Sequence, residues 1–599
     1  MILTALANYY EQLLREHPDE VPEQGWSRVK ISHLLVISEA GELVDIIPAP
    51  DKNGWMKRVP KYTQHTVAVE TENLLADKAD YLLGLKPGDS ERGVDCFEEA
   101  KKLHLSVLEK VQSPAGLALR NFFETWNPSA AAEHPAIVKA GIGDLAGSNI
   151  LLFNVDGYDI TEDLEVVSAC LDHNRDCASG AAHGRCLVTG EYAPIQLKHD
   201  SIKLLGTKAT SPLVSFNERS FESYGHYKEQ GLNAPVGEEA AFAYTTALNH
   251  LLASPSHRVR IGDTTVVYWA EHGDAANSAV MSLLLGARTE DLSFAFVDET
   301  ADASIAAVWD ALARGKAPNI AGLDSQATFH VLGIAPKAAR ISVRFYERDS
   351  FGSMLENVMR HYRRMAIVHA PWQQDFLSPY RIVRAAENPS SKNPVVASEL
   401  GGALLRSILT DTRYPESLYS NIMLRLRATQ GDKDAHAEKV SYERAAFIKA
   451  YLIKNASIYE EGTMETIDAE RDEAAYVLGR LFWVLEDIQH AANPELNATI
   501  SDKYFDRACT TPALVFPTLV ALSKKHLRKI QGKTSGLAYN LETRLGGLLA
   551  GIEAFPKSLS NTAQGDFILG YYHQKTADIH ERAEKKRERE AAESAALSE

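Results

Sequence analysis

The chain has 599 residues with an ordinary 45% hydrophobic share, and this length exceeds what one hydrophobic core organises, so we expect several domains. Its net charge of −17 argues against a protein that coats polyanions, although local basic patches can still bind nucleic acid. Five cysteines favour a reducing compartment, and we find neither a signal-peptide pattern nor roughly 20 consecutive apolar residues, so we expect a cytoplasmic protein without membrane contact.

The N-terminal part of the sequence mixes helical and strand patterns. Apolar residues share one helical face over 2–14, and the apolar runs 31–37 and 43–47 predict two strands. Residues 92–125 have a helical pattern, and mixed patterns return over 150–188. We therefore predict an α+β fold for this large N-terminal region.

Three cysteines lie close together in this region, with two histidines between them. They are Cys170, Cys177 and Cys186, and the histidines are His173 and His183. A zinc site needs about four nitrogen or sulfur ligands, and zinc knuckles use a tight pair of cysteines that is absent here. Zinc binding and buried thiols both stay open, and buried thiols are the simpler interpretation. We assign no metal and no cofactor to the chain.

A polar and aromatic loop lies between a predicted strand at 213–216 and a long helix that follows Pro235 and Gly237. Such side chains suit hydrogen bonds to base edges and stacking on bases. The candidates for these contacts are Asn217, Phe221, Tyr224, Gln230 and Asn233. The cations that we expect to contact phosphate are Lys198, Lys203, Lys208 and Arg219. The alternative is a polar surface loop with a few buried aromatics, beside lysines that protect a strand edge.

Residues 258–270 predict a strand pair, and polar residues follow it. Asp263, His272 and Asp274 could form a metal-dependent nuclease site, since carboxylates and imidazoles bind divalent metals. Their spacing is loose, and short polar turns after strands are common. We therefore expect no catalytic residues and keep the nuclease as the alternative function.

A second strand pair is predicted at 329–334 and 339–345, followed by a basic stretch. Residues 337–364 contain seven cations and three acids, an excess that is unusual in an acidic protein. Because side chains alternate along a strand, we expect one shared face for Arg340, Arg344 and Arg348. This face would contact nucleic acid or a partner subunit, or it would pair with acidic groups such as those of 275–303.

Every segment after a predicted linker at 379–394 has a helical pattern. Apolar stripes predict helices at 474–489, 513–530, 536–554 and 563–590, which suggests an all-α C-terminal bundle. The predicted domains are 1–270 with the recognition loop, 271–394 with the basic face, a helical connector at 395–470, and the bundle at 471–599.

A strip of cations without acids lies within one predicted helix of the bundle and just after it. Its members are Lys524, Lys525, Arg528, Lys529 and Lys533. Such a strip could guide a displaced single strand of DNA. The alternative is a helix C-terminus stabilised by positive charge.

Several ordered blocks of the sequence carry a family resemblance. They include MILTALANYYEQLL at the start, SFNERSFESYG with EQGLNAPVGEEAAFAYTTALNHLL, IGDTTVVYWAE (261–271), FHVLGIAPKAARISVRFYERDSFGSMLENVMRHY (329–362) and LGGALLRSILTDTRYPESLYSNIMLRLRA (400–428). These blocks are ordered and spread over almost the whole length, and together they resemble the large subunit of the type I-C CRISPR Cascade surveillance complex.

The resemblance implies a non-catalytic recognition subunit that sits beside the subunit holding the 5′ end of the guide RNA. It would read the protospacer-adjacent motif of target double-stranded DNA, help to open the duplex, stabilise the R-loop with its displaced single strand, and support recruitment of a helicase-nuclease. Its other partners would be the backbone and guide-end-binding Cascade subunits. Where the family usually carries basic and aromatic residues, this sequence has Thr63, Gln64 and His65, followed by Ala76, so we carry no RNA-end contact over to this block.

The family also makes a small subunit by internal initiation within the same gene. Met464 follows Glu460–Glu461–Gly462, whose codons resemble a bacterial ribosome-binding site. The resemblance therefore implies a second product that starts at Met464, with Met423 as the alternative start, and that contains the C-terminal bundle.

Overall fold

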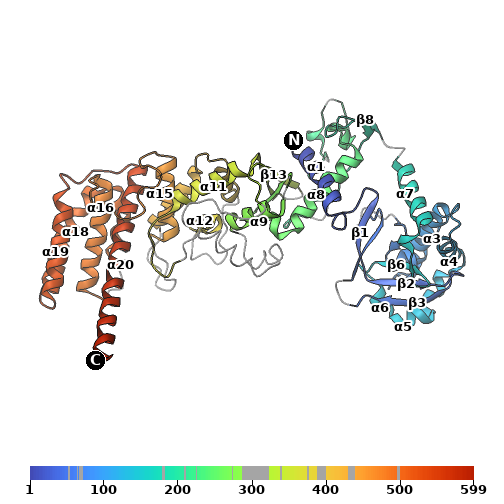
Figure 1. The fold of residues 1–599 in the computed structure, drawn as a ribbon, viewed down its shortest axis with the longest axis horizontal. Coiled ribbons are helices and arrows are strands. Elements are labelled where there is room, and N and C mark those ends of the chain that lie inside the picture. Colours follow the sequence, from blue (N-terminus) through green and yellow to red (C-terminus); the bar gives the residue numbers. More distant parts are fainter. Residues whose placement is uncertain are drawn as a thin grey trace. The chain divides into compact units, whose positions relative to one another are not determined.

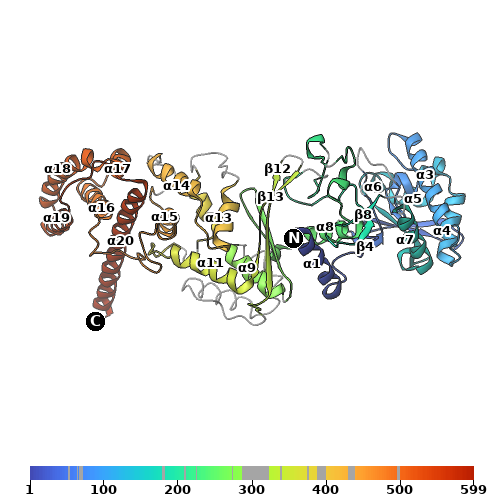
Figure 2. The ribbon, with the colours of Figure 1, turned by 90° about the horizontal axis from the view of Figure 1, so that it is seen from above.

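The computed structural model describes the whole chain except residues 51–53, 64, 66–71, 179–181, 208–210, 217, 224, 273, 287–322, 338–339, 374–376, 388–398, 429–438, 496–498 and 599. The chain forms two compact units, one of residues 1–203 and 209–250 and the other of 204–208 and 251–599. Figure 1 and Figure 2 show their helices and strands coloured along the sequence. The chain thus combines mixed sheets with a helical C-terminal region, which confirms the predicted α+β class.

The first unit is built on a small mixed sheet. Its strands follow the order β3-β2-β6-β5, with β7 paired to β6. The bounds are β2 (His33–Ile37), β3 (Leu43–Pro48), β5 (Ala76–Asp77), β6 (Leu151–Val155) and β7 (Tyr158–Asp159). A separate ladder joins β1 (Trp26–Ile31) to β4 (Trp55–Pro60). The predicted strands at 31–37 and 43–47 are confirmed as β2 and β3, while β1 and β4 were not predicted.

Helices bury the sheet of the first unit. They include α3 (Ser90–Val107), α4 (Pro114–Thr125), α5 (Pro135–Ala140) and α7 (Leu164–Ala178). Aromatic rings of α4 pack on β6, where the centroids of Phe122 and Phe153 lie 5.1 Å apart. The predicted N-terminal helix is α1 (Ile2–Glu16), and its Tyr10 ring contacts Phe242 at 5.8 Å. Phe242 belongs to α8 (Glu238–Ala253), the helix predicted to follow Pro235 and Gly237.

The strand predicted at 213–216 is wrong. The described residues there are irregular, and the single bridge nearby joins Ser201 to Pro212. Proline has no amide hydrogen to donate, so Pro212 cannot extend a ladder. The regular hairpin of this region is instead β8 (His183–Arg185) with β9 (Tyr192–Pro194).

An antiparallel sheet of order β10-β11-β12-β13 organises the start of the second unit. Its strands are β10 (Arg258–Ile261), β11 (Thr264–Ala270), β12 (Thr328–Lys337) and β13 (Arg340–Ser350), which confirms both predicted strand pairs. One face packs on α9 (Asp274–Leu285) and α11 (Phe351–Met365) through buried residues such as Tyr268 and Val358. The sheet continues across position 270, so the predicted boundary there falls inside one compact unit.

Helices follow this sheet without interruption by described strands, as predicted for the C-terminal region. They are α12 (Pro379–Arg384), α13 (Leu400–Leu409), α14 (Glu416–Ala428), α15 (Tyr442–Lys454), α16 (Ala474–Ala492), α17 (Ile500–Thr510), α18 (Pro512–Gln531), α19 (Ser535–Ala550) and α20 (Asn561–Ser598). In the bundle, α16 and α20 cross closely because Gly479 and Gly570 lie at the contact. A Cβ on Gly479 would lie 1.9 Å from the carbonyl oxygen of Phe567.

Candidate nucleic-acid interface

The predicted recognition loop is only partly described. Asn217, Tyr224 and Lys208 lie outside the described residues. Asn233 is tied to its own loop, because its Nδ2 donates to the carbonyl oxygens of His226 and Gln230 at 3.0 Å each and its Oδ1 accepts from the Ser223 N–H at 2.8 Å. Its amide therefore shapes the loop, and the predicted base contact would require these bonds to change. Phe221 and Gln230 are half-buried.

Three predicted phosphate contacts of the first unit are exposed. Lys198, Lys203 and Arg219 form no ion pair with any described residue. The Arg219 guanidinium lies 4.6 Å from the ring centroid of Tyr227, and this ring is 48% exposed. A cation held over an exposed aromatic ring presents both a charge and a stacking surface.

Backbone hydrogen bonds join the same loop to the β8–β9 hairpin and the residues after it. This hairpin was not predicted from the sequence. Leu187 N–H donates to the Pro235 carbonyl at 2.8 Å, and Gly231 N–H donates to the Leu197 carbonyl at 3.0 Å. The hairpin exposes Tyr192 at 76% of its surface. The signal in the sequence was Gly190 of the turn, a residue type that marks turns and that here has a φ of 79°. These backbone hydrogen bonds tie the described part of the loop to the hairpin and to the segment that follows it.

The cysteines of this region gather no metal set among the described residues. Cys170 is buried in α7, and the side chain of Cys177 lies outside the described part. Cys186 closes the hairpin turn, where its Sγ accepts from the N–H groups of Val188 at 3.3 Å and Thr189 at 3.4 Å. Burial raises the pKa of the Cys186 thiol, but hydrogen bonds from Thr189 and nearby backbone outweigh burial and lower this pKa. The described contacts give Cys186 a structural role in the turn.

The predicted basic face of the second unit is altered by a β-bulge. The register between β12 and β13 shifts at Gly333/Ile334, so Arg344 is the extra, unpaired residue. Arg348 opposes His330 of β12, and Arg340 opposes Lys337 of β12. His330 and Lys337 are seven positions apart, an odd number, so their side chains point to opposite faces of the sheet. Arg340 and Arg348 therefore point to opposite faces, and the prediction of one shared face is wrong.

Carboxylates also neutralise much of this stretch. Arg344 pairs with Asp263 at 3.0 Å and with Glu399 at 3.3 Å, and Arg348 pairs with Glu271 at 3.4 Å. Arg344 also lines a cavity of about 400 Å³ beside α13. The alternative interpretation, in which this stretch pairs with acidic groups, therefore describes these contacts better, although the acids come from other segments than the predicted ones.

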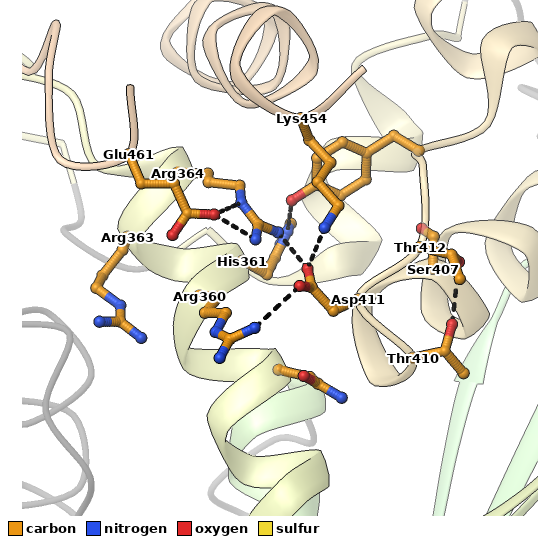
Figure 3. Close-up of polar contacts among 12 residues, drawn as sticks. Arg360, His361, Arg363, Arg364, Ser407, Thr410, Asp411, Thr412, Lys454 and Glu461 are labelled. Atoms are coloured by element: carbon orange, nitrogen blue, oxygen red, sulfur yellow. Dashed lines mark hydrogen bonds and ion pairs between the residues drawn. The ribbon is translucent and has the colours of Figure 1, made fainter. Parts of the chain in front are cut away.

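The cations at the end of α11 converge on Asp411, which follows α13. Figure 3 shows Arg360, Arg364 and Lys454 around this carboxylate, at 3.2, 2.7 and 2.9 Å. Arg364 is almost fully buried and also pairs with Glu461. Burial would raise the pKa of Asp411, but hydrogen bonds from Arg364 and Lys454 outweigh it and lower this pKa. The cluster joins α11, α15 and the segment before α16, and its cations are not available to DNA in this arrangement.

The structure separates two of the three residues of the alternative nuclease site. Asp263 precedes β11 and His272 follows it, so they lie at opposite ends of a strand that spans roughly 20 Å. Metal ligands must lie about 2 Å from one ion, so these two residues cannot share a site. Asp263 is moreover paired with Arg344.

The strip on α18 differs from the basic stretch around α11. Lys524, Lys525, Arg528, Lys529 and Lys533 are all exposed, and none of them forms an ion pair within the described part of the chain. Four of them lie on α18, within about 140° of its circumference. His526 lies within this strip, and both burial and the nearby charge of Lys529 lower its pKa. The strip is a locally positive surface on an acidic protein.

A family model described as CRISPR-associated protein (Cas_Csd1) matches residues 6–578. No curated protein matches the chain. Within the described residues, no helix is both long and apolar enough to cross a membrane.

Proposed function

Because the chain belongs to the Cas_Csd1 family of CRISPR-associated proteins, we propose that it is the large, non-enzymatic subunit of a type I-C Cascade complex. Its first unit reads the protospacer-adjacent motif of double-stranded target DNA and helps to open the duplex, while the guide RNA reads the remaining target. Its α18 strip holds the displaced single strand of the R-loop. Its protein partners are the backbone and guide-end-binding subunits, and it supports recruitment of a helicase-nuclease.

One contrast among the cations supports this proposal. Lys198, Lys203 and Arg219 in the first unit, and the strip on α18, are exposed and form no ion pair with described residues, although the chain carries a net charge of −17. The cations around α11 are instead held by carboxylates. Phosphate binding requires cations that are free to replace counterions, and the unpaired sets meet that requirement.

Binding of target DNA by the assembled complex over a salt series tests the proposal. Lys203→Ala should weaken binding of every duplex and lower the salt slope by about one unit, because one phosphate contact is lost. Arg363→Ala is the matched control, since Arg363 is occupied by Glu356, and it should leave the slope unchanged. Equal effects of the two variants would contradict the proposed use of the unpaired cations.

The non-enzymatic role is tested by incubating the purified chain with DNA and Mg²⁺ or Mn²⁺. We expect no cleavage by the chain alone. Any cleavage by the wild-type chain would contradict this part of the proposal. Cleavage that is lost in a His272→Ala variant would support the alternative nuclease, and cleavage that persists in it would place a nuclease elsewhere in the chain.

A further inference from the structure

An exposed aromatic ring lies on α19, the helix that follows α18 and packs against it. Tyr539 of α19 is 70% exposed, whereas Ala538, Leu541 and Leu545 of the same helix are buried. Leu537 beside it is 43% exposed. The helix thus buries one apolar face in the bundle and leaves a large aromatic side chain in water on the other. An exposed aromatic side chain of this size suits contact with a partner.

Tyr539 and the C-terminal end of the strip lie at a similar level along the axes of two adjacent helices. α18 ends at Gln531 and α19 begins at Ser535, and Figure 1 shows the two helices side by side. At a rise of about 1.5 Å per residue, Tyr539 lies about 6 Å from the start of α19 and Arg528 about 5 Å from the end of α18. Both side chains therefore sit at the same end of the helical hairpin, together with Lys533 of the connecting turn.

Cations beside an exposed aromatic ring match the chemistry of single-stranded nucleic acid. Cations follow the phosphate backbone, and aromatic rings stack on bases, which a duplex keeps inside its helix. We propose that Tyr539 stacks on a base of single-stranded DNA whose phosphates contact the α18 strip. The inference rests on the proposed role of this strip. Because every base has an aromatic face, the contact tolerates any sequence, as a strand of variable sequence requires.

Two oligonucleotides of equal length separate stacking from charge. One is oligothymidine of about 15 nucleotides, and the other is an abasic oligonucleotide with the same phosphates. Binding of both to the full-length chain is measured by fluorescence anisotropy. Tyr539→Ala should weaken oligothymidine binding at least about fivefold, the lower end of what one base stack contributes, and should leave abasic binding unchanged. Tyr539→Phe keeps the ring and should bind as the wild type does.

Matched variants identify which claim fails. Arg528→Ala with Lys525→Ala should weaken both probes and lower the salt slope. If that double variant binds both probes as the wild type does, the proposed role of the strip is wrong, and the stacking inference falls with it. If the double variant is weakened but Tyr539→Ala is not, or if Tyr539→Ala weakens both probes equally, the strip stands and stacking is refuted. Tyr158→Ala removes a tyrosine that is 44% exposed in the first unit and should change nothing.

Discussion

Replacing Asp411 with asparagine removes one carboxylate from the centre of three cations. Arg364 has a side chain that is only 3% exposed, so its charge cannot turn to water when this partner is lost. Breaking a buried ion pair by removing one partner costs about 3–5 kcal/mol. Glu461 still compensates Arg364, and the side chains of Arg360 and Lys454 are 43% and 22% exposed and can reach solvent. We therefore expect Asp411→Asn to destabilise the second unit by about 2–3 kcal/mol.

Urea unfolding at neutral pH measures this effect. The midpoint of the transition of the second unit should fall while its slope stays the same, because stability changes and exposed surface does not. Glu356→Gln is the control, since that carboxylate is 50% exposed and exposed ion pairs contribute only about 0–1 kcal/mol. A midpoint for Asp411→Asn equal to that of Glu356→Gln would refute the assigned role of the cluster.

The pH dependence of the same variant has a definite sign. Neighbouring cations hold the pKa of Asp411 below its usual range in the folded protein. The carboxylate therefore contributes stability above the unfolded pKa of about 3.9, and this contribution is lost as the pH falls through the folded value. The difference in unfolding free energy between the wild type and Asp411→Asn should accordingly shrink below about pH 4.

Three further changes test other parts of the structure. Burial lowers the pKa of Lys449 from 10.5 to about 8, so the unfolded state binds more protons than the folded state between these two pH values. The unfolding free energy of the wild type should therefore rise with pH in this range. Urea titrations at pH 7 and pH 10 should show this rise for the wild type and not for Lys449→Met. Gly479→Ala should lower the unfolding free energy by about 3 kcal/mol or more in thermal or urea unfolding, because the new methyl group meets the backbone oxygen of Phe567. Gly546→Ala is the control and should not destabilise the fold, because nothing lies within 4 Å of a Cβ there. Met464→Leu should abolish a short C-terminal product on immunoblots of expressing cells and leave the long chain; persistence of that product would move its start to Met423 or elsewhere.

Local patterns predicted the longer helices and the strand pairs β2–β3, β10–β11 and β12–β13, but not β1–β4 or β8–β9. The spacing of apolar residues was sufficient to predict α1, α8 and the helices of the bundle. The α18 strip could also be predicted, because its cations are near neighbours in the sequence of one helix. The strand at 213–216 was predicted wrongly because its apolar run has no partner ladder, and Pro212 cannot donate to one.

Contacts distant in sequence could not be predicted in this way. The bulge in β13 follows from packing across two strands, where the Phe345 ring lies over Gly333 so closely that a Cβ there would be 2.4 Å from the ring. The partners of the predicted basic face, such as Asp263 and Glu461, come from segments 81 and 97 residues away. Charge counting within a window therefore overestimated the basic surface around α11.

The most direct test of the account is motif preference in DNA binding by the assembled complex. Targets carry either the matching adjacent motif or a scrambled one, and the complex contains wild-type chain or Asn217→Ala, with Lys203→Ala alongside. The account predicts that Asn217→Ala removes the preference between the two targets, whereas Lys203→Ala weakens both equally and keeps the preference. Wild-type preference and affinity in both variants would contradict the claim that this surface of the first unit reads target DNA.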